Sequence, residues 1–314
     1  MSITTTGVLS PAVQQTFNLK LLAVPTPNNI HRIPAMKQMM PRHGGFDMRF
    51  RRYNPLNTFL VPLGNSGVTP PSQNLTAIDL DCKIDWYGTW LEINEQVILQ
   101  NQEQVLNEAA IRLGVALRQT EDELTRNVLA STMTQIDCVN GSNGDNPTNL
   151  TLADINNVIR ILLGNNGRMF LSSISGDLKF GTSPVRNAYL AMVHTDMTAS
   201  LSSIQGFIHQ SAYPNQERVL DSEWGAVSNI RYLVSSIGST SPNASANGRT
   251  VYNNIVVAQE GFACVEQTGA TNQFIYRPAV YSDALAQNVT IAAKFADVTR
   301  ITNDQWVLNN RSTI

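Results

Sequence analysis

The sequence predicts an α+β protein, in which one long helix accompanies strands of two kinds. Residues 94–134 carry apolar or small residues about every 3.6 positions, which is typical of a helix with one buried face. Residues 46–52 and 78–86 alternate apolar and polar side chains, which predicts half-buried strands. Three short apolar runs follow and predict buried central strands. They are residues 190–193, 230–234 and 255–258.

The long helix is expected to form the spine of the fold, because about thirty residues at roughly 1.5 Å each span about 45 Å. Its predicted buried stripe consists of Leu106, Ala110, Leu113, Leu117, Thr120, Leu124, Val128 and Ser131. On the opposite face, Glu108 precedes Arg112 and Asp122 precedes Arg126 by four residues, a spacing that favours surface ion pairs. We expect the consecutive acids at 121–123 to be solvated. Gly114 predicts a close approach by another backbone.

Residues 1–45 predict an extended amino-terminal arm. Prolines interrupt this segment, and at most a short helix is expected within residues 11–22. Up to Arg52 the chain holds seven Lys and Arg residues against the single acid Asp47, whereas the whole chain has a net charge of −2. Such an arm is compatible with nucleic-acid phosphates or with an acidic neighbour. His31 and His43 lie in the arm, where we expect no packed cavity.

Composition excludes several classes of protein. A chain of 314 residues with 42% hydrophobic content allows one large or two ordinary domains with a substantial core. The sequence holds no run of eighteen apolar residues and does not begin like a signal peptide, so we expect a soluble protein that stays in the cytosol where it is made. Cys82, Cys138 and Cys264 form no CxxC spacing, and we expect three small buried residues without a disulfide or zinc site.

The two alternating segments predict a two-stranded ribbon. Pairing them places Arg49 and Arg51 on the same face as Asp81 and Asp85, so that opposite charges meet across the strands. The other face carries Phe46, Met48, Phe50, Ile84 and Trp86. Because an isolated ribbon is only marginally stable in water, this apolar face must lie on something else, such as another subunit. Residues 62–73, rich in proline and glycine, form the expected tip.

Capping residues and turns divide the second half of the chain. Thr151 and Asp154 form a capping box, which predicts a helix that runs through Leu163. Thr195 is the expected N-cap of a short helix over residues 196–204. Residues 235–250 are small and polar and predict a surface loop that tolerates insertion. Residues 289–295 alternate again, and a turn at 302–304 predicts a C-terminal hairpin with residues 304–308.

The sequence shows no pattern typical of catalysis. His194 and Asp196 are near neighbours, but no GxSxG nucleophile elbow is present and we expect the two side chains to point apart. Residues 141–144 and 164–167 are glycine-containing turns without a Walker or GxGxxG pattern. We therefore expect no catalytic, cofactor-binding or metal-binding residues and no enzyme activity. A soluble monomeric binding module and an unrecognised hydrolase remain as alternatives.

Seven short motifs occur in a fixed order along the chain. They are FRRYNPL at 50–56, PL at 62–63, GVTP at 67–70, DWYGTW at 85–90, NEAAIRL at 107–113, AYLAMVHTDM at 188–197 and DSEWGAV at 221–227. Together they resemble a known family, the major capsid proteins of tailed bacteriophages, in particular those of podoviruses and their relatives. The order and spacing of the motifs are the specific part, and the match extends from about residue 45 to the C-terminus.

The resemblance implies a structural subunit of the icosahedral shell that encloses phage DNA, found in the virion and assembled in the host bacterial cytoplasm. It implies the capsid fold shared with herpesviruses: an arm (1–45), an extended two-stranded loop (46–90), a peripheral domain on the spine helix (91–140 and 277–314) and an axial domain (141–276). The implied partners are the chain itself in hexamers and pentamers, a scaffolding protein, a portal and packaged DNA, without a membrane.

The ribbon and the strand that follows it carry the candidate residues for contacts between subunits. These residues are Phe46, Met48, Arg49, Phe50, Arg51, Arg52, Tyr53, Asp81, Asp85, Trp86, Tyr87 and Trp90.

Overall fold

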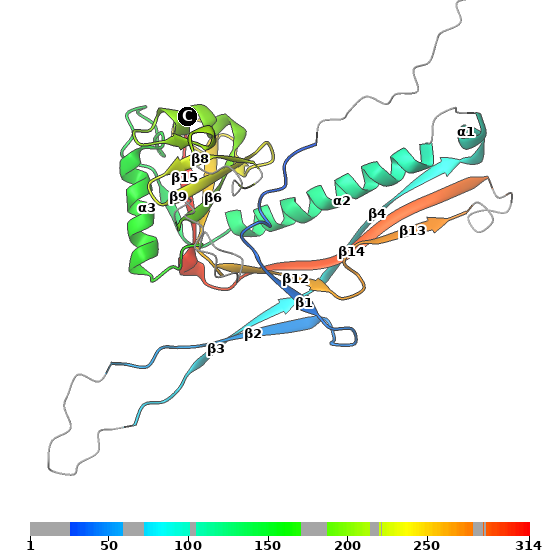
Figure 1. The fold of residues 1–314 in the computed structure, drawn as a ribbon, viewed down its shortest axis with the longest axis horizontal. Helices are drawn as coiled ribbons and strands as arrows, with labels where there is room; N and C mark the ends of the chain where they lie inside the picture. Colours follow the sequence, from blue (N-terminus) through cyan, green and yellow to red (C-terminus); the bar gives the residue numbers. More distant parts are fainter. Residues whose placement is uncertain are drawn as a thin grey trace, which may run out of the picture.

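The structure is a computed structural model that describes residues 26–58, 72–100, 105–170, 187–213, 220, 222–278, 285 and 287–314. Within these ranges it contains a long sheet, a compact sheet and a two-stranded ribbon (Figure 1). A long helix runs beside the long sheet, and the compact sheet with its own helices stands at one end (Figure 1). The predicted α+β class is therefore confirmed, with more residues in strands than in helices.

Strand β14 (Asn288–Ile301) is the central strand of the long sheet. Strand β4 (Asp85–Asn94) pairs antiparallel with it along one edge, from Asn94 opposite Asn288 to Asp85 opposite Asp297. The other edge of β14 is shared by β12 (Phe262–Gln267) and β13 (Gln273–Arg277). Strand β1 (Met36–Met40), from the amino-terminal arm, adds to β12 in parallel and completes five strands. The arm is thus part of a sheet formed by its own chain.

Helix α2 (Val105–Ala130) covers one face of this sheet, preceded by the short helix α1 (Glu95–Gln100). Leu113 and Leu117 pack on Ile291, Ala293 and Phe295, which are at most 6% exposed. The fit follows from the two periodicities. Alternate residues of a strand lie on one face of the sheet, and every third or fourth residue of a helix lies on one face of the helix. The predicted alternation over residues 289–295 is confirmed.

The C-terminal half of α2 departs from the predicted stripe. Thr120 and Ser131 are exposed, whereas Asp122, Thr125 and Leu129 are buried. The reason is that the arm and the compact sheet pack on this half of the helix from another side, so its buried face is rotated. The expectation that Asp122 is solvated is therefore wrong.

The two predicted ion pairs of the helix have opposite outcomes. Glu108 does pair with Arg112, at 2.5 Å. Because Asp122 faces inward, Arg126 instead donates to the carbonyl oxygen of Ile237, at 2.8 Å. The close neighbour of Gly114 is the Phe274 ring and not a backbone, since a Cβ atom added to this glycine would lie 3.4 Å from the ring.

The compact sheet contains the three predicted apolar runs as neighbouring strands. These are β11 (Val251–Val257), β6 (Tyr189–His194) and β9 (Ile230–Ser235), in that order. Beyond β11 lie β15 (Val307–Ser312) and β5 (Gln135–Asp137), and beyond β9 lie β8 (Glu223–Val227) and β7 (Ile208–His209), while β10 (Thr240–Ser241) pairs with β11. The expectation of buried central strands is confirmed.

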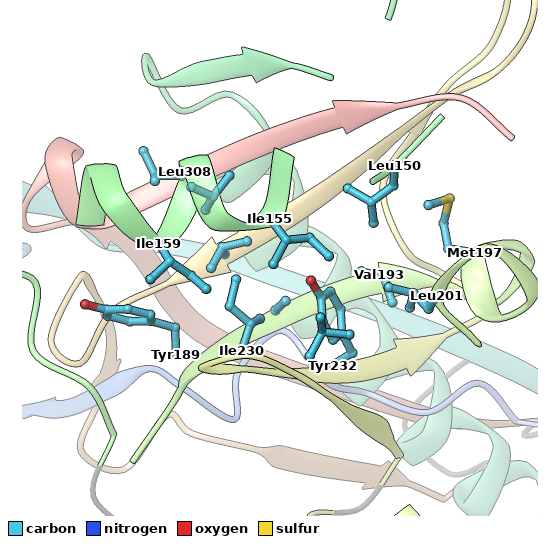
Figure 2. Close-up of a cluster of buried hydrophobic side chains, with 14 of the residues drawn as sticks. Leu150, Ile155, Ile159, Tyr189, Val193, Met197, Leu201, Ile230, Tyr232 and Leu308 are labelled. Atoms are coloured by element: carbon cyan, nitrogen blue, oxygen red, sulfur yellow. The ribbon is translucent and has the colours of Figure 1, made fainter. Parts of the chain in front are cut away.

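Helix α3 (Leu152–Gly164) packs on a face of the compact sheet. Ile155 and Ile159 of the helix point toward Tyr189, Ile230 and Tyr232 of the strands (Figure 2). The predicted capping box at its start is confirmed, because the Thr151 hydroxyl accepts from the Asp154 amide and the Asp154 carboxylate accepts from the Thr151 amide.

The expected short helix over residues 196–204 is divided into two pieces. The 3-10 helix η1 (Thr195–Met197) comes first and α4 (Thr198–Ser203) follows it. The side chain of His194, and not that of Thr195, caps η1 by accepting from the Asp196 amide. The described residues contain two further 3-10 helices, η2 (Gln210–Ala212) and η4 (Asp304–Trp306).

The predicted C-terminal hairpin is wrong. Strand β14 belongs to the long sheet and β15 to the compact sheet, so the two do not pair. The turn between them contains η4, whose N-cap Asn303 accepts from the Gln305 amide, and it redirects the chain from one sheet to the other. This connection ties the two sheets together.

Residues 235–250 are only partly exposed. Ser235, Ser239 and Ser245 are buried, so the expectation that the whole segment has almost nothing to bury is wrong. Its exposed parts are Ser236, Thr240 and residues 242–244 and 246–249. All three cysteines are free and buried, as expected. No helix in the described ranges has the length and apolar character needed to cross a lipid bilayer.

The packing of α2 on β14 predicts that Leu113→Asp unfolds the subunit. Leu113 is 3% exposed, and an unpaired carboxylate there should lower the free energy of unfolding by at least about 3 kcal/mol. Thermal unfolding followed by circular dichroism measures this loss, with Ala116→Asp on the exposed face of the same helix as the matched control. A melting temperature near that of the wild type for Leu113→Asp would contradict the assigned helix face.

Candidate intersubunit surface

The predicted ribbon exists and extends away from both sheets (Figure 1). It consists of β2 (Asp47–Tyr53) and β3 (Ala77–Lys83), paired antiparallel from Asp47 opposite Lys83 to Tyr53 opposite Ala77. Most of its side chains are exposed. The expected tip at 62–73 lies almost wholly outside the described residues. An exposed two-stranded element of this kind has little of its own subunit to stabilise it.

The charged face of the ribbon forms cross-strand ion pairs, with one correction to the predicted partners. Arg49 Nε lies 2.6 Å from Asp81 Oδ1, as expected. Arg51 Nε lies 2.7 Å from Asp79 Oδ1, so its partner is neither Asp81 nor Asp85. The hydrogen bond from Arg51 also holds the pKa of the Asp79 carboxyl below its ordinary value.

The register explains the partner of Arg51, because Arg49 stands opposite Asp81 and Arg51, two residues further on, stands opposite Asp79. Asp85 is excluded by a break in the second alternating segment. Strand β3 ends at Lys83, and the Ile84 amide donates to the Phe46 carbonyl oxygen at 3.0 Å. Strand β4 then begins at Asp85 within the long sheet, where Asp85 stands opposite Asp297 and away from the ribbon arginines. The sequence pattern continues through this break, which is why it predicts a single strand.

The apolar face of the ribbon divides into a buried and an exposed part. Ile84 is 3% exposed and packs with Met40, and Met48 and Phe50 are half-buried against the same cluster. These three side chains therefore contribute to their own subunit, contrary to the expectation that a neighbour buries them. Phe46 remains 61% exposed. Further along the ribbon, Arg52 and Tyr53 are also exposed.

The long sheet has a face that α2 does not cover. Trp86 and Trp90 of β4 are 48% and 60% exposed there, and Lys294 Nζ of β14 lies 5.5 Å from the centre of the Trp86 ring. A shallow groove of about 500 Å³ follows this face, lined by Gly88, Trp90, Ile275, Arg277, Ala292 and Lys294 among others. Tyr87 points to the opposite face and stacks on Phe295, with ring centroids 5.3 Å apart. The groove is also lined by Glu92, and an apolar face flanked by charges of both signs is suited to a protein partner.

The arm carries a buried contact that sequence reasoning missed. His31 is fully buried, and its Nδ1 lies 2.6 Å from Asp122 Oδ2 of α2. Its amide also donates to Asp122 Oδ1 at 2.8 Å. The expectation of no packed environment for His31 is therefore wrong. Two signals were available in the sequence: a histidine followed by a basic residue in the proline-rich arm, and an acid near the apolar stripe of the helix. No local sequence pattern indicates that residues so far apart in the chain are in contact.

The residues weighed for catalysis form a structural contact. His194 and Asp196 do meet, at 3.2 Å, and Tyr252 donates to Asp196 at 2.9 Å. The expectation that they point apart is wrong, yet the His194 ring acts as a helix cap. Within the described residues no group of three or more His, Cys, Asp or Glu side chains is arranged to hold a metal ion.

The chain combines a long helix beside a sheet, an arm that pairs with that sheet, a projecting ribbon and a sheet face without cover. Solved phage capsid chains have the same fold. The solved capsid of Ralstonia phage GP4 matches with a TM-score of 0.70 at 12% identity, over 99% of this chain and 98% of that one. The capsid of cyanophage P-SCSP1u matches with a TM-score of 0.69 at 12% identity, over 99% and 95%. The head of Helicobacter pylori bacteriophage KHP40 gives 0.66 at 10% identity, over 100% and 98%.

These likenesses establish the fold over nearly the whole chain. The resemblance inferred from the sequence motifs is confirmed at this level. No family model and no curated protein matches the sequence.

The observed register predicts which charge exchange repairs the ribbon. Arg51→Glu should weaken β2–β3 pairing because it sets two acids opposite each other, and adding Asp79→Arg should restore the pairing. Adding Asp81→Arg instead should not restore it. Hydrogen exchange of amides in residues 47–53 and 77–83 measures the pairing. Recovery with Asp81→Arg but not with Asp79→Arg would show that the register is shifted by two residues.

Proposed function

We propose that this chain is the structural subunit of an icosahedral shell that encloses phage DNA. The observation that carries the proposal is the fold, which agrees with solved phage capsid chains over 99% of this chain at a TM-score of 0.70. This function is structural and involves no catalysis. It places the protein in the virion.

The exposed apolar side chains support assembly from identical subunits. Phe46, Tyr53, Trp86 and Trp90 are each at least 48% exposed, although each belongs to a strand or directly precedes one. Fully burying an aromatic side chain stabilises an assembly by about 1.5–3 kcal/mol. A closed shell repeats each contact many times, so modest interfaces are enough.

In this proposal the ribbon reaches over a neighbouring subunit. The contact candidates are those inferred from the sequence, but they have two roles. Met48, Phe50 and Tyr87 attach the ribbon and β4 to their own subunit, whereas Phe46, Tyr53, Trp86 and Trp90 are available to a neighbour. The exposed Arg49–Asp81 and Arg51–Asp79 pairs keep the ribbon strands in register.

The domain division follows the same proposal. An arm (1–45) and an extended loop (46–90) would make contacts between subunits, and a peripheral domain (91–140 and 277–314) would form the shell floor. The axial domain (141–276) would meet its copies at the five- and six-fold centres. Strand β15 of the peripheral range lies in the compact sheet, and β12 and β13, near the end of the axial range, lie in the long sheet, so both ranges contribute to both sheets. A scaffolding protein, a portal and nonspecifically contacted DNA are the further partners in this proposal.

Assembly is the direct test of this function. At high concentration, with a scaffolding partner supplied, we expect negative-stain images to show closed shells or rings of one subunit. Sedimentation should show species far larger than the 34.5 kDa chain. A strictly monomeric species under all these conditions would support a binding module and contradict the proposal, and turnover of generic ester or phosphate substrates would support a hydrolase.

Shortening the ribbon should separate assembly from folding. Replacing residues 61–73 with an Asn-Gly turn should leave a subunit with wild-type circular dichroism, because this segment is rich in proline and glycine, has no apolar periodicity and can contribute little to a core. Shell formation should fall by at least about tenfold, because a contact between subunits is lost.

The matched control inserts a short Gly/Ser tag between Asn247 and Gly248, at an exposed position in the loop between β10 and β11 of the compact sheet. This variant should fold and should assemble as the wild type does. Shells of normal size and thermal stability from the shortened ribbon would show that the ribbon is not a clamp between subunits.

A further inference from the structure

Strand β4 forms a long edge of the long sheet. One side of β4 pairs with β14 through ten consecutive residue pairs, from Asp85 to Asn94, without a bulge. Among the described residues, no strand pairs with its other side. Alternate residues of an antiparallel strand direct their N–H and C=O groups to opposite sides, so about half of these groups in β4 point away from β14. Such an edge is a template for a further strand.

The other edges among the described strands carry features that hinder pairing. The compact sheet ends in β7 and β5, which contain two and three residues. Strand β1 carries Lys37, β13 ends in Arg277, and the ribbon strand β2 carries three arginines. Short strands and cationic side chains are the usual protection of a sheet edge. Strand β4 has ten residues and contains no lysine, arginine or proline, so it lacks this protection.

The charges of β4 are compatible with antiparallel pairing to a second β4. A two-fold axis perpendicular to the sheet places the two edges side by side and keeps each face of the sheet on the same side. Residues that stand opposite each other are then both even-numbered or both odd-numbered, because side chains alternate between the faces. The two acids of β4 are Asp85 and Glu92, so one can never stand opposite the other.

The exposed tryptophans favour a pairing centred on residues 88–90. Trp86 and Trp90 are 48% and 60% exposed on the face that α2 leaves uncovered, and Gly88 lies between them. With the two-fold axis at residue 88, 89 or 90, Trp90 stands opposite Trp86, Gly88 or Trp90 of the second copy. Cross-strand aromatic pairs and aromatic side chains opposite glycine both stabilise antiparallel strands. These registers also keep each acid away from its own copy.

We propose that two copies of this chain join through their β4 edges, so that their long sheets form one continuous sheet across a two-fold axis. The occupant of the edge is thus a second copy of the same strand. This inference rests on the proposed function for the supply of many copies, and it names one contact within the shell. The contact itself needs only two chains, so it can be tested with or without shells.

Cross-linking of the full-length chain at residue 89 tests the contact. Thr89 is exposed near the middle of β4, and the three native cysteines are buried, so Thr89→Cys adds one accessible thiol. In the proposed pairing, residues 89 of the two copies stand opposite each other or in diagonal positions, at most about 8 Å apart. A bis-maleimide that spans about 8 Å should therefore yield denatured dimers of twice 34.5 kDa.

Tyr276→Cys is the matched control, because Tyr276 is 59% exposed on β13, at another edge of the same sheet. Thr89→Cys should give at least about ten times as much linked dimer as Tyr276→Cys. Equal linkage in the two variants, at any level, would overturn the inference. Shells that form without linkage at residue 89 would overturn it and leave the proposed function standing. Linked dimers without shells would support the inference and contradict the proposed function.

Hydrogen exchange distinguishes a second copy from cover by the chain itself. In the wild type, alternate amides of residues 85–94 should become at least about tenfold more protected as the protein concentration is raised, because new backbone hydrogen bonds form. Thr89→Lys adds a cation to the edge and should abolish this gain without lowering the melting temperature. Full protection of these amides at every concentration would show that the chain covers its own edge and would contradict the inference.

Discussion

The packing of one face of α2 on β14 is the constraint on which the rest of the subunit depends. Leu113 and Leu117 cover Ile291, Ala293 and Phe295, and this contact joins the helix to the central strand of the long sheet. Because a single helix covers only one face of a sheet, the other face stays open, with Trp86 and Trp90 on it. An elongated sheet with one layer of cover leaves large apolar side chains exposed, and the proposed assembly would bury them.

The same helix also serves as the attachment site of the arm. Its N-terminal half packs on β14, and its C-terminal half presents Asp122 to His31 and Glu121 to Arg32. The arm thereby makes polar contacts that bridge α2, β12 and β14. A segment with many prolines is ordered here by charge and by a parallel strand, so docking of the arm responds to solution conditions more than a purely apolar contact would.

Structural features that depend on residues close together in the sequence could be predicted. Contacts between residues far apart in the sequence could not. The alternation of residues 289–295, the capping box at Thr151 and the Glu108–Arg112 pair all follow from spacing within a few residues. The fold class and the ribbon were also predictable for this reason. In contrast, His31 and Asp122 are 91 positions apart, and no local pattern indicates that they meet.

The errors at the candidate site have the same origin. Alternation continues through Ile84 although the chain passes there from the ribbon to the long sheet, which places Asp85 away from the ribbon arginines. The turn before β15 resembles a hairpin turn in sequence, but the two strands that it connects join different sheets. Exposure of Trp86 and Trp90 could not be inferred from sequence, since the position of α2 decides which face of the sheet is covered.

A density map of the assembled particle, obtained by electron cryo-microscopy, tests the central claim most directly. We expect closed shells in which the ribbon of each subunit lies on another subunit and the face with Trp86 and Trp90 is covered by a neighbour. Particles in which both surfaces remain in contact with solvent, while the subunits join through other faces, would contradict it.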